Sequence, residues 1–234
     1  MPEINPDFSL QVEHIGNEKN PLLIIDNVAA APEQLRELAT SAPGFIAQAS
    51  DFYPGLRKPV TGNYPAACLA ALEPVVRKQF DIPTHAKIEL SLCAFSLTTT
   101  PPGQLRPIQS IPHIDTHDTN QFALVHYLCA PAFGGTSLYR HRSTGFESIT
   151  QPRLQDYFRI VKQEVMAEDK REFTYINGST ALFERIIQVN ARFNRAVIYR
   201  SNQLHSADIN PHYNLSADPC HGRLTLNAFF RFTL

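Results

Sequence analysis

The sequence predicts a mainly β fold with flanking helices, an α+β protein built around a double-sheet jelly roll or barrel. Three observations lead to this fold class. Apolar residues at helical spacing occur in the first third of the chain and once more past its middle. The remainder alternates between short strand-like runs and turns that contain Pro or Gly, which is typical of double-sheet β proteins. No internal repeat replaces this pattern.

The N-terminal part is expected to hold one strand and two helices. Residues 22–25 form an apolar run that ends at an Asp-Asn pair, which predicts a strand. Pro32 is well placed for the first turn of a helix. Residues 63–80 carry apolar side chains three and four positions apart, which predicts a second helix, and Asn63 is expected to cap it.

From residue 87 onward the pattern favours strands. Residues 87–99 are rich in Leu, Ile, Phe and Thr, which predicts a long strand. A Pro-rich loop follows at residues 101–112. Shorter strands are then predicted at residues 121–128 and 136–141, on either side of a Gly-Gly turn.

One helix interrupts the strands in the last third of the chain. It is expected to begin near Thr150 and Pro152, with an apolar stripe that faces the core, made of Leu154, Tyr157, Phe158, Val161 and Val165. Further strands are predicted at residues 183–189, 195–200 and 223–232. Residues 206–222 are expected to form a polar loop.

Composition narrows the class of partner. The chain has 234 residues, no linker and a hydrophobic fraction of 43%, so we expect a single domain over residues 1–234. Lys plus Arg (21) nearly balance Asp plus Glu (22) without a basic stripe, which argues against nucleic acid. The sequence predicts no signal peptide and no membrane partner, because it has neither a leader pattern nor a long apolar run. Four widely spaced cysteines form no CxxC pair, which argues against a zinc ribbon and favours a cytoplasmic protein with reduced thiols.

The strongest chemical signal is the pair His113 and Asp115, just before a predicted strand. In an extended segment, residues two apart point to the same side, so both could bind one metal. His205, after the strand at 195–200, is a candidate third ligand. Two histidines and one carboxylate leave open coordination positions, which suits ferrous iron in an oxygenase. An isolated HxD pair is more often a hydrogen-bonded loop pair, so the surrounding residues decide between these interpretations.

The last strand supplies the first supporting feature. Arg223, Thr225 and Asn227 share one of its faces, and apolar residues occupy the other. This polar face either meets water or lines a pocket. In a pocket, a guanidinium can grip a carboxylate through two hydrogen bonds, and the Thr hydroxyl adds a third.

A tyrosine and a turn supply the second feature. Tyr127 lies near the end of the strand after Asp115, where its phenol is either a satisfied core group or a pocket group able to reach a carboxylate. The Gly134-Gly135 pair allows a tight turn into the next strand.

Together these motifs resemble the iron(II)/2-oxoglutarate-dependent oxygenase superfamily. The similarity is greatest to its prolyl-hydroxylase-like branch and to uncharacterised bacterial relatives, and it covers about residues 85–232. The resemblance implies a double-stranded β-helix, a cupin-like jelly roll, over residues 85–234 with one inserted helix at about 150–170. Residues 1–84 would pack on this core as an N-terminal strand and helices.

The resemblance also implies roles for particular residues. The iron ligands, and hence the catalytic residues, fall on His113, Asp115 and His205. The 2-oxoglutarate binders fall on Arg223 and Thr225, helped by Tyr127, with Asn227 on the same face. The cofactors implied are Fe(II), 2-oxoglutarate as cosubstrate and O2. Family members are mostly hydroxylases, so we expect hydroxylation of an amino acid, a peptide side chain or another small metabolite.

Two other functions stay open at this point. A cupin-like enzyme could use His113, Asp115, His117 and His205 to hold zinc or manganese without a keto acid, although it would have no reason to place Arg223 in the pocket. A non-catalytic jelly roll could instead bind a ligand. His117 is expected to lie outside the first ligand shell, and His126 is expected to be structural.

One departure from the family concerns loop length. His205 and Arg223 are 18 positions apart, about twice the usual spacing. The extra residues lie in the loop 206–222, which contains His212, Cys220 and His221. Long loops in compact domains often cover active sites, so this loop is either a lid or a surface insertion.

The oligomeric state stays open at this point, since an exposed helical face would allow two subunits to pair as a homodimer.

Overall fold

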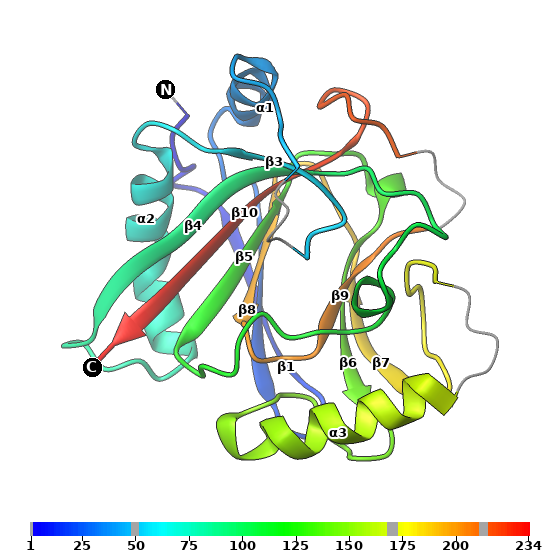
Figure 1. The fold of residues 1–234 in the computed structure, drawn as a ribbon. Helices are drawn as coiled ribbons and strands as arrows, with labels where there is room; N and C mark the ends of the chain where they lie inside the picture. The colour runs from blue at the N-terminus through cyan, green and yellow to red at the C-terminus, as the bar shows by residue number, and fades with distance from the viewer. Residues whose placement is uncertain (1, 48–51, 168–172, 211–214) are drawn as a thin grey trace.

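The computed structural model describes residues 2–47, 52–167, 173–210 and 215–234, and within them the chain forms two antiparallel sheets (Figure 1). The larger sheet has seven strands in the order β1-β2-β8-β5-β10-β4-β3, and the smaller has three in the order β7-β6-β9. The strands are β1 Ser9–Ile15, β2 Asn20–Asp26, β3 Gly55–Pro59, β4 Lys87–Thr98, β5 Gln121–Tyr127, β6 Gly135–His141, β7 Phe183–Val189, β8 Arg195–Arg200, β9 His205–Asp208 and β10 Arg223–Thr233.

The strand order is that of a double-stranded β-helix. From β4 onward the chain passes repeatedly between the sheets: β4, β5, β8 and β10 lie in the larger sheet, and β6, β7 and β9 lie in the smaller one. The first and last of these strands, β4 and β10, pair along their whole length. A chain that winds in this way between two sheets is a jelly roll, so the predicted fold class is confirmed.

Apolar side chains between and outside the sheets hold the strands in place. One cluster lies between the sheets and joins Ala123 and Val125 of β5 to Leu138 of β6 and Val197 of β8. A larger cluster covers the other face of the seven-stranded sheet. Alternate residues of a strand point to opposite faces, and the two clusters bury both faces of β5 and β10. Polar residues on the inward face of these strands point toward the space between the sheets.

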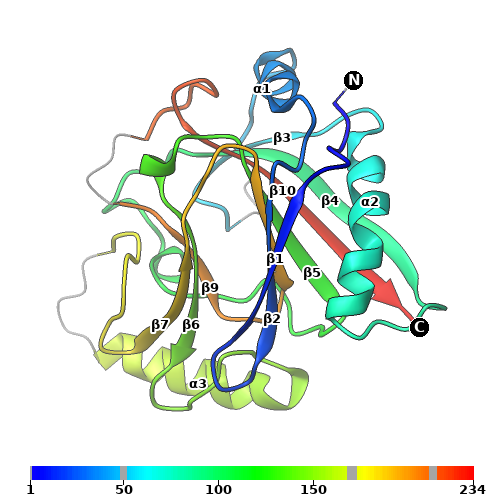
Figure 2. The same cartoon turned by 180° about the vertical axis from the view of Figure 1, so that it is seen from behind.

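Helices α1 (Pro32–Thr40) and α2 (Tyr64–Gln79) pack on the larger sheet (Figure 2). Both begin where the sequence predicts. Asn63 precedes α2 but makes no side-chain cap hydrogen bond, because it has the αR conformation (φ −88°, ψ −9°) rather than the extended one that capping requires. No helix in the described ranges is long and apolar enough to cross a membrane.

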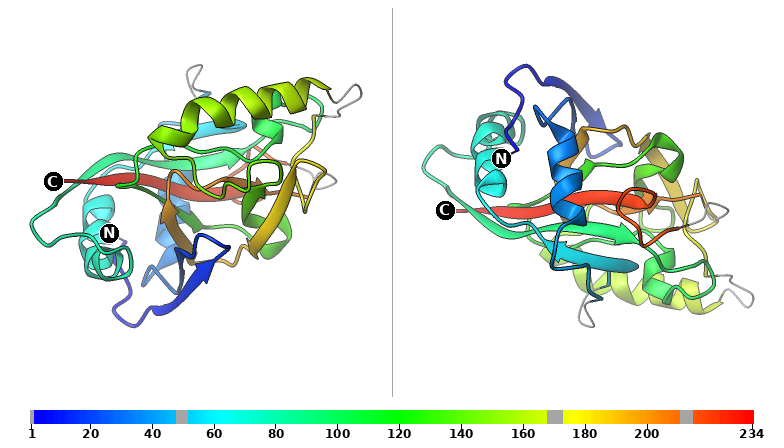
Figure 3. Two further views of the ribbon diagram at one scale, coloured as in Figure 1. Left: turned by 90° about the horizontal axis from the view of Figure 1, so that it is seen from below. Right: turned by 90° about the horizontal axis from the view of Figure 1, so that it is seen from above.

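Helix α3 (Gln151–Ala167) lies on a different side of the molecule from α2 (Figure 3). Its residues Tyr157 and Val161 are buried with Tyr139 of β6 and Phe183 of β7. Phe158, which we expected in the apolar stripe, is 46% exposed, because it lies just beyond the buried face of the helix. The predicted helix end near residue 170 falls outside the described residues.

Three strands were not predicted. β1 and β3 are edge strands at the two ends of the larger sheet, and polar residues such as Glu13 and Lys58 hide their strand pattern. β9 was wrongly assigned to the polar loop 206–222, because its sequence His-Ser-Ala-Asp has no apolar alternation. Its strand conformation comes instead from pairing with β6.

Candidate metal centre

Main-chain hydrogen bonds bring the two predicted ligand segments together. His113 lies on the segment that leads to β5, and His205 begins β9. The N–H of each residue donates to the carbonyl of the other, at 2.9 Å in both directions. The N–H of Asp115 donates to the carbonyl of Ser201, also at 2.9 Å. The segment that carries His113 and Asp115 is therefore paired to residues 201–205, which lead from β8 into β9.

The three side chains converge. His113 Nε2 lies 4.0 Å from Asp115 Oδ1, and His205 Nε2 lies 3.7 Å from Asp115 Oδ2. One ligand atom from each residue lies within 4.8 Å of the others. Among the described residues, these three form the group of His, Cys, Asp or Glu side chains close enough together to hold a metal ion. Bonds of about 2.0–2.2 Å would bring neighbouring ligands to about 3 Å, so small side-chain rotations would close the site.

The orientation of His205 is fixed from behind. Its Nδ1 lies 2.9 Å from the carbonyl oxygen of Gln203. A carbonyl can only accept, so Nδ1 carries the hydrogen and Nε2 presents its lone pair. The rings of Tyr199 and His113 pack against this imidazole, with centroids 4.8 Å and 4.5 Å from that of His205. This is the arrangement expected of a histidine that binds a metal through Nε2.

Both imidazoles are held in the neutral form. Burial and the nearby His205 together lower the pKa of His113 to about 4, although Asp115 opposes this shift. Burial likewise lowers the pKa of His205 to about 4. The His113 side chain nevertheless keeps 41% exposure, since it lines the cavity described below. At neutral pH both rings can therefore offer a lone pair without first losing a proton.

Arg223 lies on the inward face of β10 and is 2% exposed. One of its terminal nitrogens, Nη2, donates to the carbonyl of Gly135 at 2.8 Å, and Nη1 lies 3.5 Å from Thr98 Oγ1. The remaining Nε–H is buried without a hydrogen-bond partner among the described residues. Arg223 also lines the cavity described below, so its guanidinium places a positive charge where an anionic ligand can be bound.

The other predicted cosubstrate residues are less directly placed. Asn227 lines the same cavity as Arg223. The Thr225 hydroxyl donates to Asn227 Oδ1 at 2.6 Å, and the Tyr127 hydroxyl donates to Thr136 Oγ1 at 2.6 Å. Burial raises the pKa of Tyr127 to about 12, so its hydroxyl keeps its proton. Thr225 and Tyr127 therefore support cavity residues from behind and are not themselves part of the cavity wall.

The candidate ligands and Arg223 share one cavity of about 380 Å³. This volume lies in the range of small-ligand sites, and the wall combines aromatic and apolar groups with a few polar ones. Arg57 of β3 and Tyr199 of β8 are among the cavity residues that the sequence analysis missed. Alternation along the predicted strand 195–200 could have placed Tyr199 on the inner face. Arg57 gave no signal, because β3 itself was not predicted.

Residues outside this group fall into two sets. His117 is exposed and is not part of the ligand group, and His126 is buried against Asn194 as a structural histidine. In the loop expected to cover the site, Ser206 and Ala207 line the cavity. His212 lies outside the described residues, and His221 is exposed and bonded to Asp218.

Strand order and site together define the class: a double-stranded β-helix with a His-Asp-His group and a buried arginine in one cavity. The chain belongs to a family of unknown function, DUF6445, which matches residues 6–230. No curated protein matches it significantly.

Several solved structures are similar to this chain. AviO1 from Streptomyces viridochromogenes Tue57 is 13% identical, with a TM-score of 0.46 and coverage of 96% of this chain and 89% of that one. HygX from Streptomyces hygroscopicus, solved with nickel and 2-oxoglutarate, is 12% identical, with a TM-score of 0.44 and coverage of 90% and 82%. A Pseudomonas putida prolyl-4-hydroxylase is 15% identical, with a TM-score of 0.38 and coverage of 96% and 91%. All three scores are low, and the fold is defined by the strand order.

Proposed function

We propose that this chain is an iron(II)- and 2-oxoglutarate-dependent oxygenase that hydroxylates an amino acid, a peptide side chain or another small metabolite. The observation that carries the proposal is that a candidate metal-binding group and an arginine able to bind a carboxylate line the same cavity. His113, Asp115 and His205 offer two nitrogens and a carboxylate, and Arg223 offers a positively charged guanidinium. Two histidines and one carboxylate that leave coordination positions open would suit ferrous iron best.

Each residue has a defined task in this proposal. His113, Asp115 and His205 hold the iron, with the Gln203 carbonyl keeping His205 Nε2 turned toward it. Arg223 binds the distal carboxylate of 2-oxoglutarate through its guanidinium. Asn227 adds a polar group on the same wall. Iron with 2-oxoglutarate and O2 supplies the oxidation of a C–H bond, while the protein supplies orientation and a largely apolar cavity.

The volume of the cavity limits the substrate. About 380 Å³ must accommodate both the cosubstrate and the reacting part of the substrate. The substrate is therefore small, or it inserts a single side chain. Phe52 and Ile108, which line the cavity, are 61% and 39% exposed and would contact the part that stays outside.

The test is anaerobic reconstitution with ferrous iron and 2-oxoglutarate, which should produce a weak visible charge-transfer band. We expect His113→Ala and His205→Ala to lose both the metal and the band. Arg223→Gln should keep the metal but weaken 2-oxoglutarate binding by about 10- to 100-fold, since a hydrogen bond to a charged group contributes about 1.5–3 kcal/mol. His221→Ala, an exposed histidine outside the cavity, is the matched control.

Two outcomes would contradict the proposal. If the wild-type protein gives no band, or if His113→Ala leaves the band unchanged, the chain is not such an oxygenase. If metal binds but 2-oxoglutarate does not, a cupin-like metalloenzyme is favoured. Arg57→Gln tests the assignment of the anchor, because Arg57 also lines the cavity. Should this variant lose 2-oxoglutarate while Arg223→Gln keeps it, the anchor is Arg57.

A further inference from the structure

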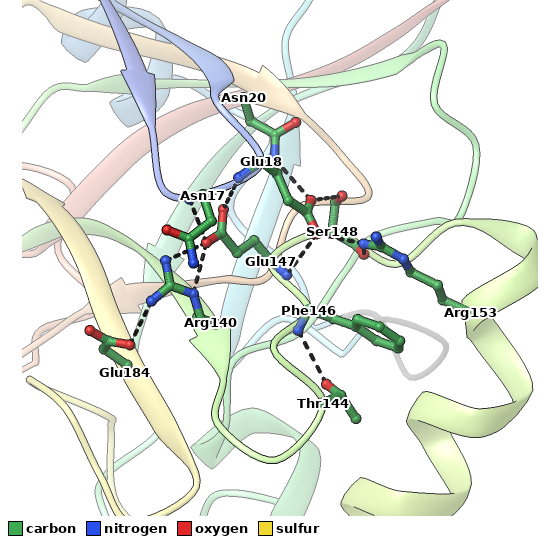
Figure 4. A network of polar contacts seen from close by, with 10 residues as sticks. All are labelled: Asn17, Glu18, Asn20, Arg140, Thr144, Phe146, Glu147, Ser148, Arg153 and Glu184. Carbon is green, nitrogen blue, oxygen red and sulfur yellow. Dashed lines mark hydrogen bonds and ion pairs between the residues drawn. The ribbon is translucent and has the colours of Figure 1, made fainter.

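A network of charged residues lies outside the cavity, between the β1–β2 hairpin and the segment that follows β6 (Figure 4). At its centre is the carboxylate of Glu147, which is 3% exposed. Its Oε1 accepts the N–H of Asn17 at 2.8 Å and two N–H groups of Arg140, at 2.8 and 2.5 Å. Its Oε2 accepts the N–H of Glu18 at 3.1 Å. A buried carboxylate is tolerated only with partners of this number and kind.

The bonds between Glu18 and Glu147 are reciprocal. The Glu18 carboxylate accepts the main-chain N–H of Glu147 at 3.3 Å, while the Glu147 carboxylate accepts that of Glu18. Glu18 also accepts the Ser148 hydroxyl and one N–H of Arg153, the latter at 2.5 Å. Burial raises the pKa of Glu18, but these hydrogen bonds outweigh it and lower the pKa overall. We call this pair, with Ser148, the glutamate clasp.

The hairpin turn is shaped around the clasp. Gly16 has φ +66°, and a Cβ there would lie 2.0 Å from Glu147 Oε2. Any side chain at position 16 would therefore collide with the carboxylate. Because glycine has no Cβ, the turn between β1 and β2 can approach the clasp more closely than it could with any other residue at position 16.

The main chain of the clasp supports the residues just before His205. The Glu147 carbonyl accepts the N–H of Leu204 at 2.8 Å. Ser148 forms an isolated β-bridge with Gln203. The Leu204 carbonyl accepts the N–H of Tyr139 of β6, also at 2.8 Å. Leu204 is thus held on both sides, by the clasp segment and by the smaller sheet.

A short chain of bonds then leads to the candidate metal ligand. Ser148 pairs with Gln203, and the Gln203 carbonyl accepts the Nδ1–H of His205. That bond fixes which nitrogen of His205 is available and where it points. The orientation of the imidazole therefore depends on the Gln203 peptide, and the position of this peptide depends on the clasp.

We propose that the glutamate clasp is a positioning element for the metal site, which sets metal affinity by fixing His205 through residues 203 and 204. The inference rests on the proposed function only in requiring that His205 bind a metal. Groups that orient a metal-binding histidine from behind typically change metal affinity by about 10- to 100-fold when they are removed. Glu147 and Glu18 act one bond further out, through the main chain.

The experiment compares Glu147→Gln with Glu184→Gln in the full-length protein, using Co²⁺ as the probe. Both variants remove a carboxylate that pairs with Arg140, but Glu184 is 42% exposed and bonds to Arg140 from β7, away from residues 147–149. We expect Glu147→Gln to raise the cobalt dissociation constant by about tenfold and to alter the visible cobalt spectrum. Glu184→Gln should match the wild type in both. Thermal unfolding without metal reports any loss of stability separately.

Each outcome decides the matter. If Glu147→Gln is folded and less stable but binds cobalt with wild-type affinity and spectrum, the clasp only fastens the hairpin and the inference is overturned. Should Glu147→Gln fail to fold, Glu18→Gln, whose carboxylate is more exposed, is judged by the same two readouts. If the wild-type protein binds no cobalt at His205, the proposed function fails too. If cobalt binds and depends on Glu147 but 2-oxoglutarate does not bind, only the proposed function fails.

Discussion

His113 and His205 are joined by their main chains: each N–H donates to the carbonyl of the other at 2.9 Å, so the two imidazoles lie side by side before any metal binds. The bridge depends on the backbone and not on the rings. Replacing either side chain should therefore leave the fold intact while removing a ligand.

The first prediction follows from this division, in which the main chain holds the two segments together and the side chains bind the metal. His113→Ala and His205→Ala should each unfold, without metal, close to the wild-type temperature. With Co²⁺ at about 100 times its dissociation constant, the wild type should gain about 2.7 kcal/mol of stability. For a protein of this size that gain corresponds to a rise of roughly 5–10 °C. Differential scanning calorimetry with and without cobalt measures it, and an equal rise in either variant would remove that histidine from the ligand set.

The second prediction concerns the Gly-Gly turn before β6. Gly134 has φ +77°, and a Cβ there would lie 1.8 Å from the main-chain oxygen of Asp208. With ψ at 171°, Gly134 also lies in a backbone region essentially confined to glycine. Gly134→Ala should therefore cost roughly 4 kcal/mol, from backbone strain of about 1–3 kcal/mol together with overpacking of about 1–3 kcal/mol.

Gly145 is the matched control for that substitution. Its φ is +71°, but a Cβ there would have nothing within 4 Å. Gly145→Ala should cost only the strain of about 1–2 kcal/mol. Urea unfolding of both variants gives the comparison. Equal losses would mean that the close approach to Asp208 relaxes at little cost.

The sequence predicted those strands and site residues whose pattern lies within one short segment. β5, β7, β8 and β10 were found within a residue or two because apolar alternation is written in their own sequences. β9 was not, since its strand conformation depends on pairing with β6. His113 and Asp115 could be paired because they are two apart.

Contacts between distant segments could not be predicted in the same way. Glu18 and Glu147 are 129 positions apart, and neither belongs to a motif. Arg57 reaches the cavity from an edge strand whose Gly-Leu-Arg-Lys-Pro sequence looks like a loop. The unpartnered Arg223 Nε depends on which acceptors the fold leaves out of reach, a property that no single strand sequence contains.

The third prediction concerns His126 and acid stability. Asn194 Oδ1 accepts the N–H of Ala29, and Asn194 Nδ2 donates to the Ala29 carbonyl, so the amide orientation is set. His126 must then donate through Nε2 to Asn194 Oδ1, at 3.0 Å. Its Nδ1 is buried without a partner among the described residues, so a second proton has nowhere to bind favourably.

The pH window follows from the pKa of this histidine. Burial lowers the pKa of His126 from 6.5 to about 4, although the bond to Asn194 raises it slightly. Between these values the unfolded chain binds a proton that the folded chain does not, so the free energy of unfolding falls as pH falls. At pH 5 the loss from this group should be about 2 kcal/mol relative to pH 7.5.

His126→Gln keeps a donor for Asn194 but cannot titrate. We expect it to lose less stability than the wild type between pH 7.5 and pH 5, measured by urea unfolding of the metal-free protein at both values. His221→Gln, an exposed substitution, should behave like the wild type. Identical pH dependence in His126→Gln and the wild type would show that His126 takes up its proton in the folded state.

The last prediction separates the charge of Arg223 from its shape. Its guanidinium lines the cavity, and its Nη2 is already bonded to the carbonyl of Gly135. A lysine at this position keeps the charge but lacks the planar guanidinium, which can bond to the Gly135 carbonyl and to a carboxylate at the same time. Arg223→Lys should therefore weaken 2-oxoglutarate binding by about 10- to 100-fold.

A shorter keto acid provides the internal control. 2-Oxobutyrate carries the keto acid group but no distal carboxylate, so it cannot use Arg223. Its dissociation constant should be the same in the wild type and in Arg223→Lys, measured by anaerobic titration of the iron-loaded protein. The preference for 2-oxoglutarate over 2-oxobutyrate should thus collapse in the variant alone. A preference that survives the substitution would move the distal carboxylate away from β10 and toward the other guanidinium in the cavity, that of Arg57.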